Sequence, residues 1–225
     1  MGLNVIITGA TGMVGKGVLL ECLDSKTIDS VLVVNRNALG MEHPKLKELI
    51  VEDFFNLVPI EKDLVGYDAC FFCLGITSVG TPEDVYQKIT YDLTMNFAKT
   101  LLKQNENMTF CYVSGQGTDS TEKGRTRWAR VKGKTENDLL NLGFKSAYMF
   151  RPGFIQPQRG ITSRTKLYNL LYVFFSPLYA ILKHFPGAAT STTNMGLAMI
   201  RVASAGSPKT ILGNSDINLL VKEII

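Results

Sequence analysis

The sequence predicts an α/β protein with a Rossmann-like, doubly wound parallel sheet of about seven strands and a small C-terminal cap. Short apolar runs alternate with longer helical patterns along the chain, and a glycine-rich turn joins the first of these runs to the first helical pattern. Very apolar strands separated by helices are typical of parallel sheets covered on both faces. We therefore expect residues 1–225 to form a single domain.

The predicted elements follow one another at the spacing of strand–helix–strand units. Strands are expected at residues 4–8, 31–35, 49–52, 69–74, 108–114, 146–150 and 210–212. Helices are expected at residues 12–22, 91–104, 127–141 and 194–203. Thr81 and Pro82 are typical of a helix start, and Gly143 is typical of a helix end. After residue 150 the pattern becomes irregular, and residues 156–190 are expected to form a cap on the sheet.

Composition excludes several classes of protein. The chain is 45% hydrophobic and 20% charged, which is typical of a globular protein. Its net charge of +4 is too small to predict tight binding to nucleic acid. Met1 leads into an apolar run, residues 5–7, that is too short for a secretory signal, so we expect a reducing, cytoplasmic setting.

The four cysteines do not form a recognisable redox or metal motif. Cys70 and Cys73 fall in the apolar run at residues 69–74, which is expected to be a buried strand. Their odd spacing directs the two thiols to opposite faces of that strand. Core packing is therefore the favoured interpretation. His43 and His184 are isolated, and no metal site is expected.

The most apolar segment is residues 167–182. It contains Asn169 and Pro177 and falls short of the about 20 apolar residues of a transmembrane helix. A helix over the ligand cleft, or one buried in a homodimer interface, is one interpretation. A membrane-surface anchor is the other, and it is less favoured because the segment has no lysine-rich face.

The first motif with a chemical role is the turn Thr8-Gly9-Ala10-Thr11-Gly12-Met13-Val14-Gly15. Glycines placed between a strand and a helix allow a tight turn and a close backbone approach to a pyrophosphate. The free amides and the positive end of the helix dipole then meet its negative charge. We predict a dinucleotide site formed by Gly9, Thr11, Gly12, Met13, Val14 and Gly15.

The spacing G-x-x-G-x-x-G resembles the short-chain dehydrogenase/reductase superfamily, in its extended and atypical branches, which include nucleoside-diphosphate-sugar epimerases. Three further motifs resemble the Tat-interacting-protein-like oxidoreductases of that superfamily. They are Phe72-Cys73-Leu74-Gly75-Ile76-Thr77, Val131-Lys132-Gly133-Lys134 and Phe150-Arg151-Pro152-Gly153. Their order and spacing cover nearly the whole chain.

NADP(H) is the predicted cofactor. Rossmann proteins that prefer NAD carry an acidic residue about 20 positions after the glycine loop, whereas this chain has Asn35 and Arg36. A guanidinium can meet the 2′-phosphate of NADP with two hydrogen bonds. The resemblance implies contacts to adenine from Asp53 and Phe54, a cofactor loop at Leu74 and Gly75, and a nicotinamide neighbour at Pro152 and Gly153.

Catalytic residues are where the chain departs from the family. The family's acid/base pair is Tyr-x-x-x-Lys on a helix, and the matching run here begins with Trp128 and ends with Lys132. An indole cannot exchange a proton near neutral pH, so Trp128 cannot be the general acid, while Lys132 can still bind the cofactor. Ser114 is the predicted hydroxyl that polarises a carbonyl. Tyr91, Tyr112 and Tyr168 are alternative proton donors, although ordinary packing explains each of them as well.

Two functional hypotheses follow. The first is an NADP(H)-dependent oxidoreductase or sugar-nucleotide-epimerase-like enzyme that uses Ser114 and Lys132 on a small carbonyl or sugar-nucleotide substrate. The second is a catalytically inactive protein that senses NADPH or acts as a scaffold. The basic run at residues 123–134 is interpreted as a solvated helix face and not as a nucleic-acid site.

Overall fold

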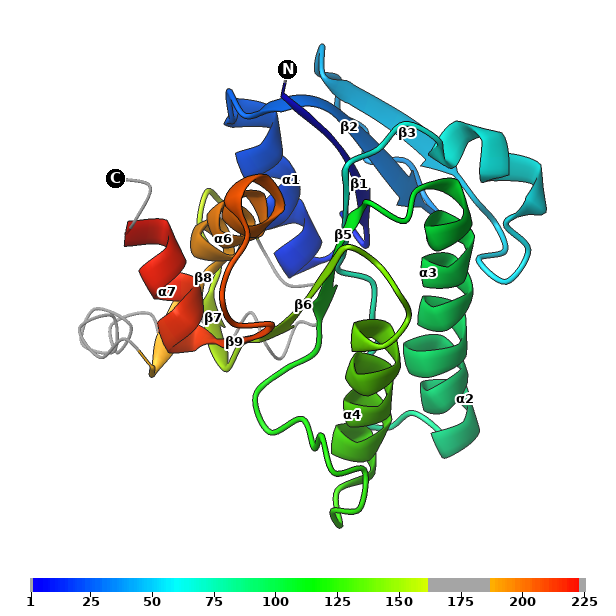
Figure 1. Cartoon of the computed structure of the whole chain (residues 1–225), viewed down its shortest axis with the longest axis vertical. Coiled ribbons are helices and arrows are strands. Elements are labelled where there is room, and N and C mark those ends of the chain that lie inside the picture. The colour runs from blue at the N-terminus through cyan, green and yellow to red at the C-terminus, as the bar shows by residue number, and fades with distance from the viewer. Residues whose placement is uncertain (1, 162–186, 223–225) are drawn as a thin grey trace.

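A seven-stranded parallel sheet forms the centre of the chain in a computed structural model that describes residues 2–161 and 187–222 (Figure 1). The strand order is β3-β2-β1-β4-β5-β6-β9. The strands are β1 (Leu3–Thr8), β2 (Ile28–Asn35), β3 (Leu46–Ile50), β4 (Ala69–Phe72), β5 (Thr109–Val113), β6 (Ser146–Arg151) and β9 (Ile211–Gly213). This architecture confirms the predicted Rossmann-like fold class.

Helices cover both faces of the sheet (Figure 1). One face carries α1 (Met13–Asp24), α6 (Thr192–Ala205) and α7 (Asn214–Lys222). The other carries α3 (Leu93–Gln104) and α4 (Arg127–Leu140), with the short α2 (Glu83–Gln87) leading into α3 through a π-helical turn at Lys88–Asp92. A 3₁₀ helix at Val58–Leu64 connects β3 to β4.

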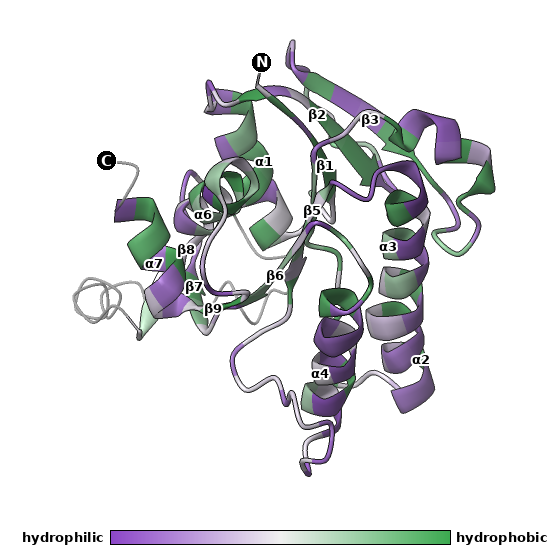
Figure 2. Cartoon of the chain, viewed as in Figure 1, coloured by the Kyte–Doolittle hydropathy of each residue, from purple (hydrophilic) through white to green (hydrophobic). Residues whose placement is uncertain are grey.

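Two hydrophobic cores lie on the two faces of the sheet. Val5 and Ile7 of β1 point into the core under α1 and α6, while Ile6 points into the core under α3 and α4. Alternate residues of a strand face opposite sides, so a strand buried on both faces must be apolar throughout. Hydrophobic residues accordingly run along the central strands, whereas the outer sides of α2 and α4 are hydrophilic (Figure 2).

The predicted separation of Cys70 and Cys73 is confirmed. Cys70 is fully buried in the core under α3 and α4, and Cys73 packs against the opposite core. The four cysteines are free thiols. Burial raises the pKa of Cys73 to about 12, so it remains protonated near neutral pH.

Several predicted boundaries are corrected. The predicted strand at residues 49–52 is β3, Leu46–Ile50, and the predicted strands at 69–74 and 108–114 are shorter at their carboxyl ends. Pro82, not Thr81, is the N-cap residue of α2. The C-cap of α4 is Asn141, and Gly143 follows it with a φ of +110°.

Part of the predicted cap lies outside the described residues, including Tyr168, His184 and the apolar segment 167–182. At its two ends, β7 (Phe154–Gln156) and β8 (Ala189–Ser191) pair in parallel as a separate two-stranded sheet. Among the described residues, no helix is long and apolar enough to cross a membrane.

Candidate functional site

The glycine turn lies at the carboxyl end of β1 and touches the end of β4. Gly9 has a φ of +70°, and a Cβ added there would lie 2.7 Å from the backbone of Cys73 and Leu74. Only glycine combines this left-handed backbone with so close an approach. The backbone after β4 therefore packs directly against one side of the turn, and the turn lines a cavity beyond the strand ends.

The third glycine of the motif brings α1 against the turn. A Cβ on Gly15 would lie 2.3 Å from the carbonyl oxygen of Gly9, so any side chain would push the helix outward. Gly12 is the N-cap residue, and the first helical hydrogen bond runs from Lys16 N to Gly12 O at 2.9 Å.

No side chain caps α1, and its first turn holds no acidic residue. The leading amides, those of Met13, Val14 and Gly15, precede the first helical hydrogen bond. The start of α1 can therefore serve an anion through its amides and its dipole.

Two adjoining cavities lie where the turn meets the ends of β2 and β4. The first, of about 140 Å³, is lined by Gly9, Thr11 and Gly12 from the turn, by Asn35 and Arg36 from the end of β2, and by Leu74 after β4. The second, of about 150 Å³, holds Asp53 on its wall. Arg36, Phe54, Leu74 and Gly75 line both cavities.

Eight predicted cofactor residues are thus brought together from four segments of the chain. These residues are Gly9, Thr11, Gly12, Arg36, Asp53, Phe54, Leu74 and Gly75. Phe54 is fixed by stacking on Phe97, with ring centroids 6.1 Å apart, and Asp53 Oδ1 accepts a hydrogen bond from Phe55 N at 2.8 Å. The site lies beyond the carboxyl ends of the strands, where open α/β sheets bind ligands.

Lys132 projects from α4 to the end of β5. Its Nζ donates a hydrogen bond to the carbonyl oxygen of Ser114. Burial lowers the pKa of Lys132 to about 8, while the nearby Glu136 carboxylate opposes this shift. An amine that titrates near neutral pH is suited to proton chemistry as well as to binding.

The hydroxyl of Ser114, which was predicted to polarise a carbonyl, is bonded to the protein backbone. The side chain of Ser114 is buried, and its Oγ donates a hydrogen bond to Phe150 O at 3.1 Å. The geometry therefore gives this hydroxyl a partner between β5 and β6. The backbone carbonyl of Ser114 accepts a hydrogen bond from Lys132 Nζ.

Trp128 stands one turn before Lys132 on α4. Its indole lies against Gly117, whose added Cβ would be 3.4 Å from the ring. Gly117 has a φ of +86°, and the turn that it forms leaves room for the indole. The Trp128 ring therefore packs against the loop that precedes α4.

Two of the three tyrosines predicted as alternative proton donors, Tyr91 and Tyr112, lie in the described part of the chain. Tyr112 is buried in the core, and burial raises its pKa far above the ordinary value. Tyr91 donates a hydrogen bond to Asp138 Oδ2 at 2.5 Å, and this bond raises its pKa. Neither phenol is poised to release a proton near neutral pH.

Pro152 and Gly153 follow β6 and border the loop after β5. Pro152 O accepts a hydrogen bond from Gln116 N at 2.8 Å, and Gly153 N donates one to Asn214 Oδ1 at 3.0 Å. They line neither of the two small cavities. Pro152 and Gly153 lie near Ser114 and Lys132, where β5 and β6 end.

An ion pair beneath α4 was missed from the sequence. Glu136 is fully buried, and its carboxylate accepts hydrogen bonds from Arg151 Nε at 3.1 and 3.0 Å. Arg151 also donates to Ser120 Oγ in the loop before α4. The pair joins α4, β6 and this loop around Lys132, and nothing in the spacing of these residues predicts it.

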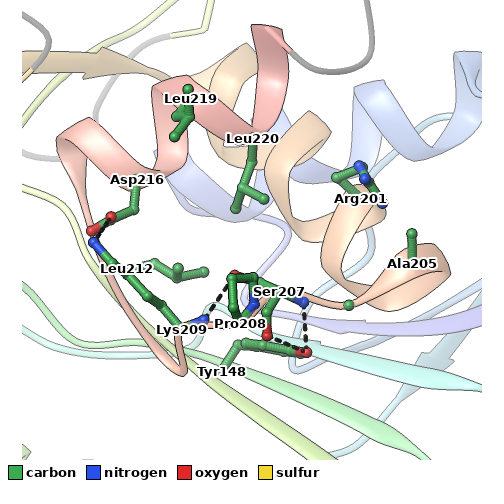
Figure 3. A pocket seen from close by; sticks show the side chains of 11 residues that line it. Tyr148, Arg201, Ala205, Ser207, Pro208, Lys209, Leu212, Asp216, Leu219 and Leu220 are labelled. Carbon is green, nitrogen blue, oxygen red and sulfur yellow. Dashed lines mark hydrogen bonds and ion pairs between the residues drawn. The ribbon is translucent and has the colours of Figure 1, made fainter.

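A larger cavity, of about 510 Å³, lies away from these residues (Figure 3). It is bordered by Tyr148 on β6, by Ser207 and Lys209 just before β9, and by Leu219 and Leu220 on α7. Lys209 Nζ is paired with Asp216 at 2.6 Å, and Ser207 N donates to Tyr148 Oη at 3.0 Å. Residues that precede a strand lie at its amino end, opposite the edge that binds ligands in such sheets.

Within the described ranges, no three histidine, cysteine or acidic side chains are grouped so as to hold a metal ion. His43 Nδ1 accepts a hydrogen bond from Lys45 N at 3.2 Å in the loop before β3.

Curated proteins similar in sequence include two groups. The mitochondrial protein FMP52 of Meyerozyma guilliermondii is 26% identical over 233 residues, which span 98% of this chain and 96% of that protein. The protein HTATIP2 of Rattus norvegicus is 29% identical over 154 residues, which span 68% of this chain and 62% of the rat protein. No protein-family model matches the chain.

Solved structures share the fold at low identity. A UDP-N-acetylglucosamine 4-epimerase from Methanobrevibacter ruminantium has a TM-score of 0.67 at 16% identity, with 99% of this chain and 81% of that chain covered. A short-chain dehydrogenase from Burkholderia cenocepacia in complex with NADP has a TM-score of 0.65 at 12% identity, with 99% and 92% covered. The predicted resemblance to short-chain dehydrogenases and epimerases is confirmed at the level of the fold.

The cytoplasmic localisation expected from the sequence is corrected by these comparisons. The FMP52 relatives from several fungi are named mitochondrial proteins. The expectation rested on the absence of a secretory signal at Met1, and that absence does not distinguish the cytoplasm from an organelle.

Proposed function

We propose that this chain binds NADP(H) and acts as an oxidoreductase or sugar-nucleotide-epimerase-like protein of the atypical short-chain type. One observation carries the proposal: the glycine turn, the end of β2 and the end of β4 converge on two adjoining cavities at the carboxyl edge of the sheet. The cavities are lined by residues that suit a phosphate and a ring.

The residues present fit a dinucleotide. Gly9 and Gly12 leave the space that a Cβ would fill, and the start of α1 offers amides to the pyrophosphate. Phe54 and Leu74 provide apolar walls for adenine, with Asp53 at the rim. When bound, such a cofactor supplies or accepts a hydride.

Lys132 and its surroundings form the reactive end of the proposed site. The Ser114 carbonyl and the Glu136–Arg151 pair hold Lys132 at the end of β5, where its ammonium would bind the nicotinamide ribose. A pKa of about 8 lets Lys132 hold or release a proton at Nζ close to neutral pH. A carbonyl compound or a sugar nucleotide is the proposed substrate.

The preference for NADP(H) over NAD(H) is assigned to Arg36. Solved neighbours contain either NAD⁺ or NADP, so the fold accommodates both. Arg36 lines both cavities at the end of β2, where its guanidinium can meet a 2′-phosphate.

Calorimetric titration of the nucleotide-free protein with NADPH and NADH tests this assignment. Arg36→Ala is expected to weaken NADPH binding by about tenfold to a hundredfold, because a hydrogen bond to a charged group contributes about 1.5–3 kcal/mol. NADH binding should change little. Arg125→Ala, a change at an exposed arginine before α4, is the matched control. Absence of binding by either cofactor would overturn the proposal.

A catalytically inactive protein that senses NADPH is the second candidate, and Trp128 favours it. By the resemblance, the indole would take the place of the family's general acid, and an indole does not exchange a proton near neutral pH. Every residue named above as lining the cofactor cavities is compatible with binding alone.

Trp128→Tyr separates the two candidates. If the protein has lost an ancestral activity, the Trp128→Tyr variant is expected to gain NADPH-dependent reduction of a carbonyl compound in a broad panel. Lys132 is still in place to lower the pKa of the new phenol. An enzyme that uses Lys132 or another donor is active before the change and gains little. Trp128→Phe, which removes the indole without adding a proton donor, is the control.

A further inference from the structure

Two lysine–acid pairs of the same spacing lie on α4, and only one of them forms an ion pair in the described part of the chain. Lys134 Nζ lies 2.8 Å from Oδ2 of Asp138, four residues later on the helix. Lys132 and Glu136 have the same order and spacing, so their side chains are neighbours on one face of the helix. No ion pair joins these two among the described residues. The two pairs therefore differ in their surroundings and not in their spacing.

Arg151 accounts for the difference, because it occupies the Glu136 carboxylate. Its Nε donates to Glu136 Oε1 at 3.1 Å and to Oε2 at 3.0 Å, and its Nη2 donates to Oε2 as well. Glu136 is fully buried, and the side chain of Arg151 is only 20% exposed. A guanidinium that makes such a paired contact is a stronger partner for a buried carboxylate than a single ammonium. The carboxylate is thereby withheld from the neighbouring lysine.

The Lys132 ammonium keeps hydrogen-bond donors for a ligand as a result. An ammonium has three N–H donors, and Lys132 Nζ uses one of them on the Ser114 carbonyl. No second acceptor for Nζ lies among the described residues. Burial lowers the pKa of Lys132 to about 8, while the Glu136 carboxylate opposes this shift without binding the amine. Lys132 is therefore largely protonated near neutral pH, with N–H groups left over.

The balance of charge around Lys132 is set by Glu136 and Arg151. Glu136 is the charged group that acts on the pKa of Lys132. Tyr112 of β5 also lies near Glu136, but burial raises the pKa of this phenol far above its ordinary value, so it is neutral near pH 7. From the loop before α4, Ser120 Oγ accepts a hydrogen bond from Arg151 and adds no charge.

We propose that Arg151 is a positioning residue of this site: by binding the Glu136 carboxylate, it keeps that carboxylate from pairing with Lys132 and so leaves the ammonium for the dinucleotide. The proposal rests on the proposed function. Glu136 then acts on Lys132 without contact, as a charge that favours the protonated amine. Arg151 acts through Glu136 and needs no contact of its own with the ligand.

The titration of Lys132 in the ligand-free protein is the first test, because two single changes should shift it in opposite directions. Arg151→Met frees Glu136 to pair with the amine, so the pKa of Lys132 is expected to rise from about 8 toward 10.5. Glu136→Gln removes the carboxylate, so the pKa of Lys132 is expected to fall below 8. A pair that only held the fold would, once broken, admit water and move both variants toward 10.5. NMR of protein with isotope-labelled lysine side chains measures these values, and Lys132→Met identifies the signal.

Dinucleotide binding is the second test, and it includes a rescue. Calorimetric titration with NADPH at about pH 6.5, where the amine is largely protonated, is expected to show binding to Arg151→Met weakened by about tenfold or more. The reason is that the amine loses a charge-assisted hydrogen bond to the ligand. Addition of Glu136→Gln to Arg151→Met removes the competing carboxylate and should restore most of the affinity.

The double variant also keeps the proposal testable if Arg151→Met does not fold, because it leaves no unpaired charge in the core. Its NADPH affinity is then compared with that of the parent. Arg127→Met, which breaks an exposed ion pair with Glu83 on the same helix, is the matched control and should change neither the titration of Lys132 nor NADPH binding.

Opposite shifts in the pKa of Lys132, together with the rescue of NADPH binding, support the proposal. If both single variants shift this pKa in the same direction, or if the double variant does not recover NADPH affinity, the proposal is wrong and the proposed function stands. If the parent binds no dinucleotide, the proposed function fails as well, since no such ligand then remains for the Lys132 ammonium.

Discussion

At the scale of single residues, the site combines groups that are read from sequence with groups that only the structure reveals. Gly9, Gly12 and Arg36 follow from their spacing, and each of them lines the first cavity. Asn35 is adjacent to Arg36 in the sequence, but only the structure shows that its Nδ2 is buried without a hydrogen-bond partner. The opposite holds for Ser114, which has the expected position in the chain but turns its hydroxyl toward Phe150.

The titration of Lys132 gives a prediction for stability against pH. Burial lowers its pKa from 10.5 to about 8 in the folded protein. At pH 7 the amine is protonated whether the chain is folded or not. Between pH 8 and 10.5 the unfolded chain binds more protons than the native protein, so stability rises with pH across this window.

The measurement compares the free energy of unfolding of the parent and of Lys132→Met. The difference is expected to shift in favour of the parent by about 1–2 kcal/mol between about pH 8 and 9.5. Lys134→Met is the control, because its exposed amine is paired with Asp138 and its pKa is raised. A group of that kind loses its contribution only above 10.5, so its difference should be flat across the window. A flat curve for Lys132→Met would show that this pKa is not lowered.

At the scale of elements, long apolar strands and the glycine turn could be predicted, whereas short or irregular elements could not. β1 and β2 were recognised because each contains an uninterrupted apolar run, residues 5–7 in β1 and residues 31–34 in β2. β3 was placed about three residues late, since Leu46–Ile50 lies at the edge of the sheet and holds two adjacent charged residues, Lys47 and Glu48, which interrupt the apolar run. β7 and β8 have three residues each, too few for any periodicity, and α7 begins directly after β9 without a loop.

The helix before α3 illustrates a different kind of failure. The start signature at residues 81–82 was recognised and the helix at 91–104 was predicted, but they were not joined. The structure connects them through a π-helical turn at Lys88–Asp92, which breaks the 3.6-residue periodicity. The Glu136–Arg151 pair was missed for a related reason, because the two residues come together only when β6 is placed next to α4.

The contact between α4 and the loop before it gives the second prediction. A Cβ on Gly133 would lie 1.8 Å from the carbonyl oxygen of Asp119. The loop is also held by a hydrogen bond from Asp119 N to Ala129 O at 3.0 Å. Gly133→Ala must therefore displace backbone, and this strain is expected to outweigh the gain in helix propensity of about 1 kcal/mol.

The expected net loss for Gly133→Ala is about 1–2 kcal/mol in the free energy of unfolding. The rate of amide hydrogen exchange at residues 115–126 should rise in the same variant, because the loop no longer packs closely against α4. Gly75→Ala is the matched control, since an added Cβ there meets nothing within 4 Å. If Gly133→Ala left the free energy of unfolding and the amide exchange rates unchanged, close packing at Gly133 would not hold the loop against α4.

At the scale of the whole molecule, the central sheet contributes one face to each of two hydrophobic cores. Phe71 and Phe72 are neighbours on β4 and are both fully buried, one in each core. Because every central strand contributes side chains to both layers, removal of either helix layer would expose a whole face of apolar residues. We therefore expect the two helix layers to unfold together.

The buried cysteines allow a direct test of this coupling, because they are distributed between the layers. Cys22 lies in the core under α1 and α6, and Cys70 lies in the core under α3 and α4. Burial raises the pKa of both thiols well above the ordinary value, so neither reacts until its surroundings open. In chains that keep one of these cysteines, with the other three changed to alanine, the rate of thiol labelling reports the free energy of opening.

Coupled layers predict opening free energies for Cys22 and Cys70 that agree within about 1 kcal/mol after correction for the stability of each variant. Cys73, which is only partly buried and borders the first cavity, should react faster and slow down when a dinucleotide is bound. If Cys70 opened at a free energy several kcal/mol below that of Cys22, the α3–α4 layer would separate on its own. The proposed nucleotide-binding edge, formed by β1, β2 and β4, would then lie on a sheet that is covered on only one face during such openings.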